Sequence, residues 1–156
     1  MLEILVPGYP PLHLSSLVLD YNGTLACDGE MIPGARQRLD ALSRIIEIHV
    51  LTADTFGDVR DRVGNIPCRL AVIAGEKQAE AKLDYTARLG FRNTACIGNG
   101  RNDRLMLKEA ALGIAVVQEE GASVEAVFAA DVVVLNIVDA LDLLLHPLRL
   151  TATLRS

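Results

Sequence analysis

The sequence is poor in the residues that would indicate several common protein classes. Trp is absent and aromatic residues make up only 4% of the 156 residues, although 51% are hydrophobic. A core must therefore be built mainly from Val, Leu, Ile and Ala, a composition typical of buried parallel sheets. No apolar run approaches the roughly 18 residues that a membrane-spanning helix needs. We therefore expect no membrane partner.

Positive charge is scarce and dispersed. Fifteen Lys and Arg residues stand against 20 Asp and Glu residues, which gives a net charge of −5. No basic cluster is present that could neutralise a phosphate backbone, so nucleic acid is not an expected partner. The first cationic side chain is Arg36, and Pro7 and Gly8 interrupt the short apolar start, a pattern unlike a signal peptide. We therefore expect a cytoplasmic protein.

Cysteine is also scarce. Cys27, Cys68 and Cys96 are odd in number, widely spaced and without a CxxC pair. This spacing argues against a disulfide framework and against a structural zinc site. We expect three reduced thiols at core or near-core positions.

Apolar strand-like runs alternate with helical patterns along most of the chain. We expect strands over residues 17–20, 48–51, 70–73, 94–97, 114–117 and 132–135, and helices over 35–46, 55–65, 76–89, 102–111, 122–129 and 138–145. This alternation predicts an α/β fold: a doubly wound, Rossmann-like, mostly parallel sheet with helices on both faces and right-handed crossovers. The length fits a single domain over residues 1–156.

Several boundaries depend on local signals. Thr55 and Asp58 have the spacing of a capping box, and Gly90 is expected to end the third helix in the left-handed conformation. Residues 2–6 are expected as an edge strand or an extended lead-in. Residues 148–154 are expected to dock on the domain or on a second chain.

The stretch that organises the chain is Leu17-Val18-Leu19-Asp20, followed by Asn22-Gly23. A short continuous apolar run predicts a strand buried on both faces, and it carries one carboxylate to its carboxyl end, where open α/β sheets bind ligands. Asn-Gly is also the preferred dipeptide of a type I′ hairpin. These residues alone leave both interpretations open.

Three stretches in order along the chain resemble the first, second and fourth motifs of the haloacid dehalogenase superfamily of phosphatases and phosphotransferases. They are Asp20-Tyr21-Asn22-Gly23-Thr24, Val50-Leu51-Thr52-Ala53-Asp54 and Ile97-Gly98-Asn99-Gly100-Arg101-Asn102-Asp103. The last is similar to the corresponding motif of P-type ATPase phosphorylation domains. The resemblance implies a HAD-like fold with a small flap over residues 25–33. Because the motifs lie too close together to hold an inserted cap, the chain resembles the capless members.

The resemblance also implies a role for each motif residue. Asp20 would be the nucleophile that forms an aspartyl-phosphate, and Thr52 would bind a phosphate oxygen. Lys82 would supply the cation, with Lys77 as the competing candidate. The set implied to bind substrate is Gly23, Thr24, Thr52, Ala53, Lys82 and Asn102, and the set implied to hold Mg²⁺ is Asp20, Asn22, Asn99 and Asp103. Each has a structural alternative, such as a turn-capping Asp, a solvated helix lysine or a helix-capping carboxylate.

Two positions depart from the family pattern. Asn22 replaces the Asp that protonates the leaving group, a role worth about 10²–10⁴ in rate. P-type ATPases also lack a carboxylate there, so Asn22 favours activated substrates such as nucleotide, acyl or aryl phosphates. Asn99 replaces a magnesium-binding Asp, which removes one negative charge and predicts weaker metal binding.

Three hypotheses follow. The first is a Mg²⁺-dependent phosphohydrolase, resembling a soluble P-type ATPase phosphorylation domain, that acts on a small phosphorylated substrate or a phosphoprotein. The alternative is a catalytically degenerate relative that binds phosphate, nucleotide or a protein partner. A receiver-like phosphoacceptor domain fits less well, because Glu3 is the only carboxylate before Asp20. A homo-oligomer is compatible with all three.

Overall fold

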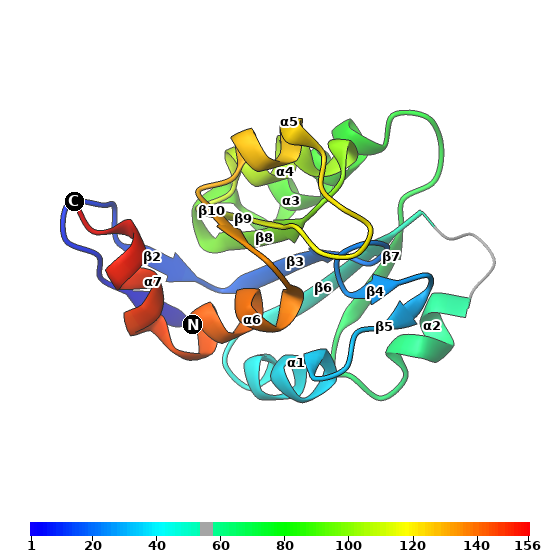
Figure 1. The fold of residues 1–156 in the computed structure, drawn as a ribbon, viewed down its shortest axis with the longest axis horizontal. Helices are drawn as coiled ribbons and strands as arrows, with labels where there is room; N and C mark the ends of the chain where they lie inside the picture. Colours follow the sequence, from blue (N-terminus) through cyan, green and yellow to red (C-terminus); the bar gives the residue numbers. More distant parts are fainter. Residues whose placement is uncertain (54–57) are drawn as a thin grey trace.

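The protein is described from a computed structural model that covers residues 1–53 and 58–156. Its centre is a sheet in the order β10-β9-β8-β3-β6-β7, in which every neighbouring pair is parallel (Figure 1). The strands are β3 (Ser16–Asp20), β6 (Glu47–Thr52), β7 (Arg69–Val72), β8 (Thr94–Gly98), β9 (Leu112–Val116) and β10 (Val132–Val134). The expected parallel α/β sheet is confirmed.

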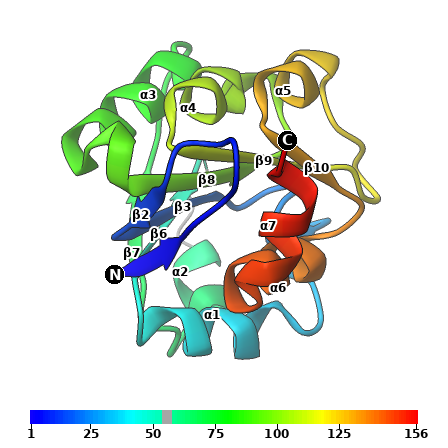
Figure 2. The ribbon, with the colours of Figure 1, turned by 90° about the vertical axis from the view of Figure 1, so that its left-hand side faces the viewer.

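Helices cover both faces of this sheet (Figures 1 and 2). On one face lie α3 (Gln78–Leu89), α4 (Arg104–Glu109) and α5 (Val124–Ala129), and on the other lie α1 (Ala35–Ser43) and α6 (Ile137–Leu145). The short helix α2 (Asp58–Val63) lies close to the flap. Two 3₁₀ turns, η1 (Phe91–Asn93) and η2 (Arg101–Asp103), flank β8.

The central strand β3 is buried along its whole length. Side chains alternate between the two faces of a strand, so Leu17 and Leu19 pack in the core beneath α1 and α6, whereas Val18 packs in the core beneath α3 and α4. A strand with apolar contacts on both faces reads as an uninterrupted hydrophobic run. This double burial fixes the position of Asp20 at the strand's carboxyl end.

The turn after Asp20 is not a two-residue hairpin. Strand β3 pairs only in parallel, with β6 and β8, and the antiparallel flap forms farther on, between β4 (Ala26–Cys27) and β5 (Glu30–Met31). Within the described residues, only the flap and α1 lie between β3 and β6, and only α2 lies between β6 and β7. This spacing is that of a capless chain.

The amino-terminal residues differ from the expected edge strand. Strand β1 (Leu2–Ile4) pairs antiparallel with β2 (Leu12–Leu14), and the two form a separate ribbon at the end of the molecule opposite the flap (Figure 1). The sequence pattern did not predict β2, because Pro10 and Pro11 stand directly before it.

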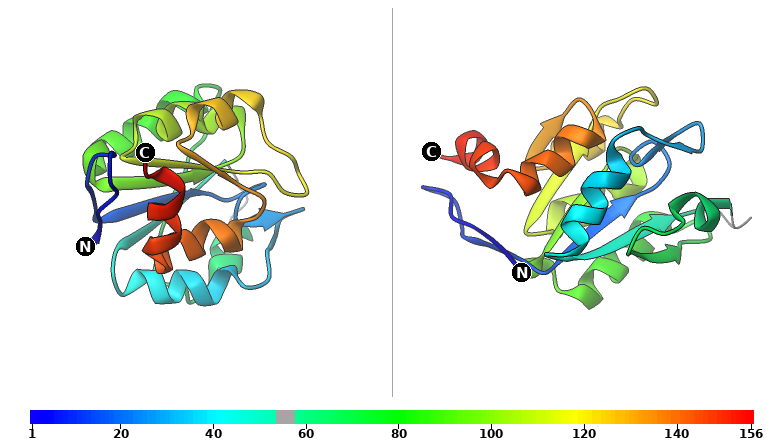
Figure 3. Two further views of the ribbon diagram at one scale, coloured as in Figure 1. Left: turned by 60° about the vertical axis from the view of Figure 1, so that its left-hand side comes forward. Right: turned by 90° about the horizontal axis from the view of Figure 1, so that it is seen from below.

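The carboxyl-terminal residues form α7 (Pro147–Leu154), which docks beside this ribbon (Figures 2 and 3). Leu150 is fully buried, the Thr151 hydroxyl donates to the Leu5 carbonyl at 3.3 Å, and the Ser156 amide donates to the Pro7 carbonyl at 3.2 Å. The sequence left open whether residues 148–154 dock on the domain or on a second chain, and in the structure they dock on the domain, beside the β1–β2 ribbon.

Some predicted boundaries were wrong by a few residues. Helix α1 ends at Ser43, α3 begins at Gln78, and the helix expected over 102–111 divides into η2 and α4. Gly90 ends α3 with φ +92° but ψ 109°, so its backbone is not left-handed helical. The predicted capping box begins at Thr55, outside the described residues, although Asp58 does begin α2.

Two structural findings concern the helices and the cysteines. Throughout the described residues, every helix is too short or too polar to cross a membrane. All three cysteines are free thiols; Cys96 is buried and the other two are half-buried.

Candidate active site

Three side chains from separate segments meet at the carboxyl edge of the sheet. Asp20 ends β3, Asp103 ends η2 just beyond the neighbouring strand β8, and Lys82 comes from α3. The Lys82 ammonium donates to Asp20 Oδ1 and to Asp103 Oδ1, both at 2.6 Å. Lys82 is 1% exposed, Asp103 0% and Asp20 7%. Of these three side chains, Asp20 is therefore the most exposed to solvent.

The structure distinguishes the two candidate lysines by position. Lys82 lies one turn inside α3 and reaches both carboxylates, whereas Lys77 is exposed at the residue before the helix. The phosphate-binding role of Lys82 stays a prediction, but only Lys82 has the contact with Asp20 that such a role needs.

Burial and charge act against each other in this cluster. Burial raises the pKa of Asp20 to about 7, nearby Asp103 adds to the rise, and Lys82 and the Thr24 hydroxyl partly oppose it. Burial lowers the pKa of Lys82, but the two carboxylates outweigh burial and the net pKa is raised. Lys82 is thus held as a cation between two carboxylates.

Asp103 is tied into the turn that follows β8. Its Oδ2 accepts hydrogen bonds from the backbone amides of Asn99 (3.1 Å) and Gly100 (2.9 Å), while its Oδ1 accepts from Lys82. A Cβ on Gly98 would lie 2.5 Å from the Asp103 carboxyl carbon, which explains the glycine. Because both carboxylate oxygens are engaged, Asp103 orients Lys82 and the turn.

Thr24 connects the two motifs that contain the departures. Its buried hydroxyl lies 3.3 Å from Asp20 Oδ2 and 3.2 Å from Asn99 Oδ1, so it can donate to either oxygen. The Asn99 amide nitrogen donates to the Gly121 carbonyl at 3.0 Å. Gly23 has φ +79°, and a side chain there would overlap the Asn99 amide. Close packing therefore joins the first and fourth motifs.

Oxygen ligands suited to a hard cation lie around the Thr24 hydroxyl. Asp20 Oδ2 and Asn99 Oδ1 flank it, and oxygen is the ligand that Mg²⁺ prefers. No group of three His, Cys, Asp or Glu side chains that could hold a metal ion occurs among the described residues. The donor type fits Mg²⁺, but the negative charge is low because Asn99 is neutral.

The remaining predicted site residues lie around this cluster. Thr52 is buried at the end of β6, one residue beyond Leu51, which pairs with Asp20, and exposed Ala53 follows it. Asn22 is exposed and lines a pocket of about 270 Å³ between the flap and α2, where Arg62 of α2 forms an ion pair with Glu30 of the flap.

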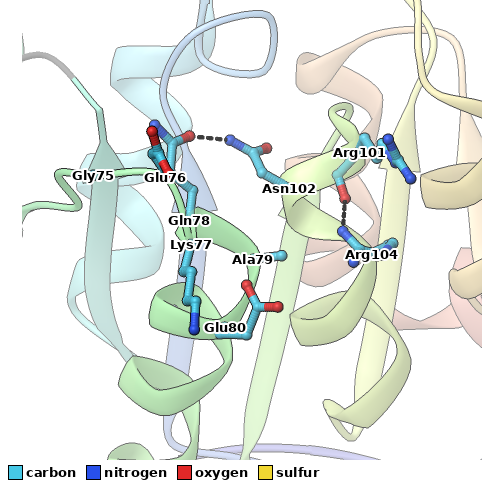
Figure 4. Close-up of a pocket in the computed structure, with 9 residues that line it drawn as sticks. All are labelled: Gly75, Glu76, Lys77, Gln78, Ala79, Glu80, Arg101, Asn102 and Arg104. Carbon is cyan, nitrogen blue, oxygen red and sulfur yellow. Dashed lines mark hydrogen bonds between the residues drawn. The ribbon is translucent and has the colours of Figure 1, made fainter.

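A larger pocket of about 620 Å³ lies between the start of α3 and the η2–α4 segment (Figure 4). Asn102 donates to Gln78 Oε1 at 2.7 Å across it. Its charged side chains are of both signs: Glu76, Lys77, Glu80, Arg101 and Arg104. Asn102, a predicted substrate-binding residue, lines this pocket, whereas Asp20, Lys82 and Asp103 do not.

Sequence reasoning missed Gln118. It follows β9 by two residues, and its amide nitrogen donates to the carbonyls of Gly23 (2.9 Å) and Thr24 (2.7 Å). Its position after the carboxyl end of a parallel strand was the only signal that could have indicated it.

Comparison with solved structures identifies the fold. A 3-deoxy-D-manno-octulosonate 8-phosphate phosphatase from Moraxella catarrhalis has a TM-score of 0.71 at 20% identity over 85% of this chain and 86% of its own. A cobalt-bound deoxy-D-mannose-octulosonate 8-phosphate phosphatase from Haemophilus influenzae gives 0.72 at 17% identity over 92% and 94%. A Yersinia pestis 3-deoxy-D-manno-octulosonate 8-phosphate phosphatase gives 0.70 at 16% identity over 99% and 95%. The chain therefore has the fold of capless haloacid dehalogenase superfamily hydrolases, as the motifs predicted.

Two relatives from Methanocaldococcus jannaschii are more similar in sequence. "Uncharacterized protein MJ0073" is 56% identical over 59 residues, which span 38% of this chain and 63% of that protein. "Uncharacterized protein MJ0072" is 46% identical over 39 residues, which span 25% of this chain and 89% of that protein. The chain belongs to the same family as MJ0072. No family model matches the chain.

Proposed function

We propose that the protein is a phosphohydrolase that forms an aspartyl-phosphate at Asp20. The observation that carries this proposal is the buried lysine that bonds Asp20 and Asp103 at 2.6 Å each, at the carboxyl edge of a parallel sheet. A purely structural ion pair would not need a second carboxylate or an opening to solvent at Asp20. Buried ionisable clusters with a raised pKa often mark functional sites.

In the first step an Asp20 oxygen attacks the phosphorus atom, and the bond from phosphorus to the leaving oxygen breaks. In the second step water attacks the aspartyl-phosphate, which releases phosphate and restores the carboxylate. Lys82 offsets the charge that grows on the phosphoryl oxygens, and Asp103 keeps its ammonium in place.

We also propose Mg²⁺ as the cofactor, held by Asp20 and Asn99. Magnesium in this position would neutralise charge on the phosphoryl group. The Moraxella phosphatase structure contains magnesium and phosphate, and the Haemophilus phosphatase structure contains cobalt, which supports a divalent ion here. Because Asn99 contributes no charge, we expect weak binding. The metal-binding roles of Asn22 and Asp103 stay predictions.

The proposed substrates are activated phosphates. Asn22 cannot donate a proton to a leaving alkoxide, so the leaving group must depart as a stable anion. Nucleotide, acyl and aryl phosphates meet this condition. The pocket of about 620 Å³ that Asn102 lines has the size of a small-molecule site and would receive the leaving group. A phosphoprotein substrate, a homo-oligomer and a cytoplasmic location stay predictions.

The test is hydrolysis of p-nitrophenyl phosphate, acetyl phosphate and ATP, with and without Mg²⁺, by the wild type and Asp20→Asn. We expect the substitution to abolish all Mg²⁺-dependent turnover; activity that survives it would falsify the nucleophile assignment. Asn22→Asp should raise turnover of an alkyl phosphomonoester such as glycerol phosphate. If turnover does not rise, the explanation based on the missing acid is wrong.

A second candidate function is phosphate or nucleotide binding, or binding of a protein partner, without useful catalysis. Asn22 and Asn99 favour this function. Asn22 cannot protonate the leaving group, and Asn99 brings no negative charge to the magnesium site. An inactive wild type that still binds beryllofluoride with Mg²⁺ in an Asp20-dependent manner would support this function.

A further inference from the structure

The loop between β9 and α5, residues 117–123, contacts both motifs that bear the reacting groups. Its Gln118 bonds the turn after Asp20, and its Gly121 carbonyl and Ser123 amide bond the Asn99 side chain and backbone at 3.0 and 2.8 Å. The Glu120 carboxylate also accepts a hydrogen bond from the Asp28 amide at the tip of the flap, at 3.3 Å. No superfamily motif noted in the sequence lies in this loop.

Gln118 makes three hydrogen bonds with one side-chain amide. Its nitrogen donates to the Gly23 and Thr24 carbonyls, and its oxygen accepts from the Ile137 amide at 2.9 Å, at the start of α6. A carboxylate could accept from Ile137 but could not donate to the carbonyls, and an apolar side chain could do neither. The side-chain amide of Gln matches all three partners.

These bonds act on the residue that contacts the candidate nucleophile. The backbone of Thr24 is held by Gln118, and the Thr24 hydroxyl lies at hydrogen-bonding distance from Asp20 Oδ2 and Asn99 Oδ1. A chain of contacts therefore runs from α6 through Gln118 and Thr24 to Asp20. The half-buried Gln118 is thus linked to Asp20 through Thr24.

We infer that Gln118 is a positioning residue, which fixes the Gly23–Thr24 turn so that Asp20 and Asn99 keep the geometry needed to receive a phosphoryl group. This inference rests on the proposed function. A displacement of about 1 Å at a reacting group can lower the rate about 100-fold. Loss of the Gln118 bonds should therefore lower kcat far more than it changes KM.

The experiment uses Gln118→Met, which has a similar length and no hydrogen-bonding amide, and Gln118→Glu, which keeps only the acceptor. Hydrolysis of p-nitrophenyl phosphate with Mg²⁺ should show kcat lowered about 10- to 100-fold in both variants, with KM within about twofold of wild type. Glu119→Gln, an exposed change in the same loop, should leave both constants unchanged.

A matched control separates positioning from general loss of stability. Leu150→Ala removes a fully buried side chain of α7, at the end of the molecule opposite the flap, without touching the turn after Asp20 (Figure 1). If Leu150→Ala lowers kcat as much as Gln118→Met at an equal fall in melting temperature, or if the Gln118 variants keep wild-type kcat, the inference is overturned.

Binding gives a readout that does not need turnover. Beryllofluoride with Mg²⁺, followed by ¹⁹F NMR, should bind the wild type and the Glu119 variant, and should bind both Gln118 variants at least about 10-fold more weakly. Equal binding by the wild type and the Gln118 variants would contradict the inference. Failure of the proposed function looks different, because Asp20→Asn would then keep the activity or bind the probe like the wild type.

Discussion

The Asp20 carboxylate destabilises the folded chain at the pH at which it would act as a nucleophile. Its pKa is raised to about 7, chiefly by burial, so the folded state binds a proton more tightly than the unfolded state. Stability from this group is therefore greatest at acid pH and is lost as the pH rises from the ordinary carboxylic range through 7. Functional sites often bury an ionisable group in this way, and the charged form that reacts is then the form that lowers stability.

We predict that Asp20→Asn is more stable than the wild type above pH 7 in the presence of a chelator, by at least about 1 kcal/mol. The difference should shrink toward pH 4, where the wild-type carboxyl is protonated in the folded state. Chemical denaturation at pH 4, 6 and 8 measures it. A variant that is less stable at pH 8 would show that attraction to Lys82 outweighs burial.

Lys82 has the opposite effect on the cluster, because it is the only cation that contacts either buried carboxylate in the described structure. Lys82→Met would leave Asp20 and Asp103 without their partner and should lower the free energy of unfolding by about 3–5 kcal/mol. The matched control is Lys77→Met in the exposed residue before α3, which should change stability by less than about 0.5 kcal/mol. Equal effects in urea denaturation would contradict the distinction between the two lysines.

At the scale of elements, an ion pair joins α1 and α6, the two helices that cover the same face of the sheet. The Arg38 guanidinium of α1 makes two hydrogen bonds to the Asp142 carboxylate of α6, at 2.7 and 3.0 Å. Arg38 holds the pKa of Asp142 below its ordinary value, against the effect of burial. A lowered carboxyl pKa contributes stability that is present at neutral pH and lost as the pH falls below the ordinary carboxylic range.

Arg38→Gln should therefore lower the melting temperature at pH 7, and the difference from wild type should disappear at strongly acid pH. Arg44→Gln is the control, at the residue that follows the last residue of α1, because its bond to Asp40 joins residues four apart and its side chain is 78% exposed. Thermal unfolding of the three proteins at pH 7 and at pH 3 checks the prediction. A pH-independent loss in Arg38→Gln would show that packing of the arginine stem dominates.

The sequence predicted the elements that have strong local signals. Strand β3 was predictable because its apolar run is buried on both faces, and Asp20 and Asp103 because motifs mark them. Strand β2 was not predictable, since Pro10 and Pro11 stand directly before it and separate it from its partner β1. Gln118 was not either, because its three partners lie 19 to 95 residues away and leave no local pattern.

At the scale of the whole molecule, the candidate site and the docked termini lie at opposite ends of the sheet (Figure 1). The flap and the turn after Asp20 are at one end, and the β1–β2 ribbon and α7 are at the other. Because the length of the sheet separates the two regions, we expect stability gained at the α7 end to support the fold without altering the chemistry.

The helix α7 offers a direct test of this separation. Leu150 is fully buried, whereas Leu148 in the same helix is 83% exposed. Leu150→Ala should lower the free energy of unfolding by about 2–4 kcal/mol through loss of burial and creation of a cavity, and Leu148→Ala by less than about 0.5 kcal/mol. Both variants should keep the wild-type kcat on p-nitrophenyl phosphate below their melting temperatures. If Leu148→Ala instead changes the molecular mass measured by sedimentation, the exposed face of α7 is an interface between chains and the predicted homo-oligomer forms there.

If Leu150→Ala lowers kcat while the chain is still folded, the two ends are coupled and their proposed separation is wrong.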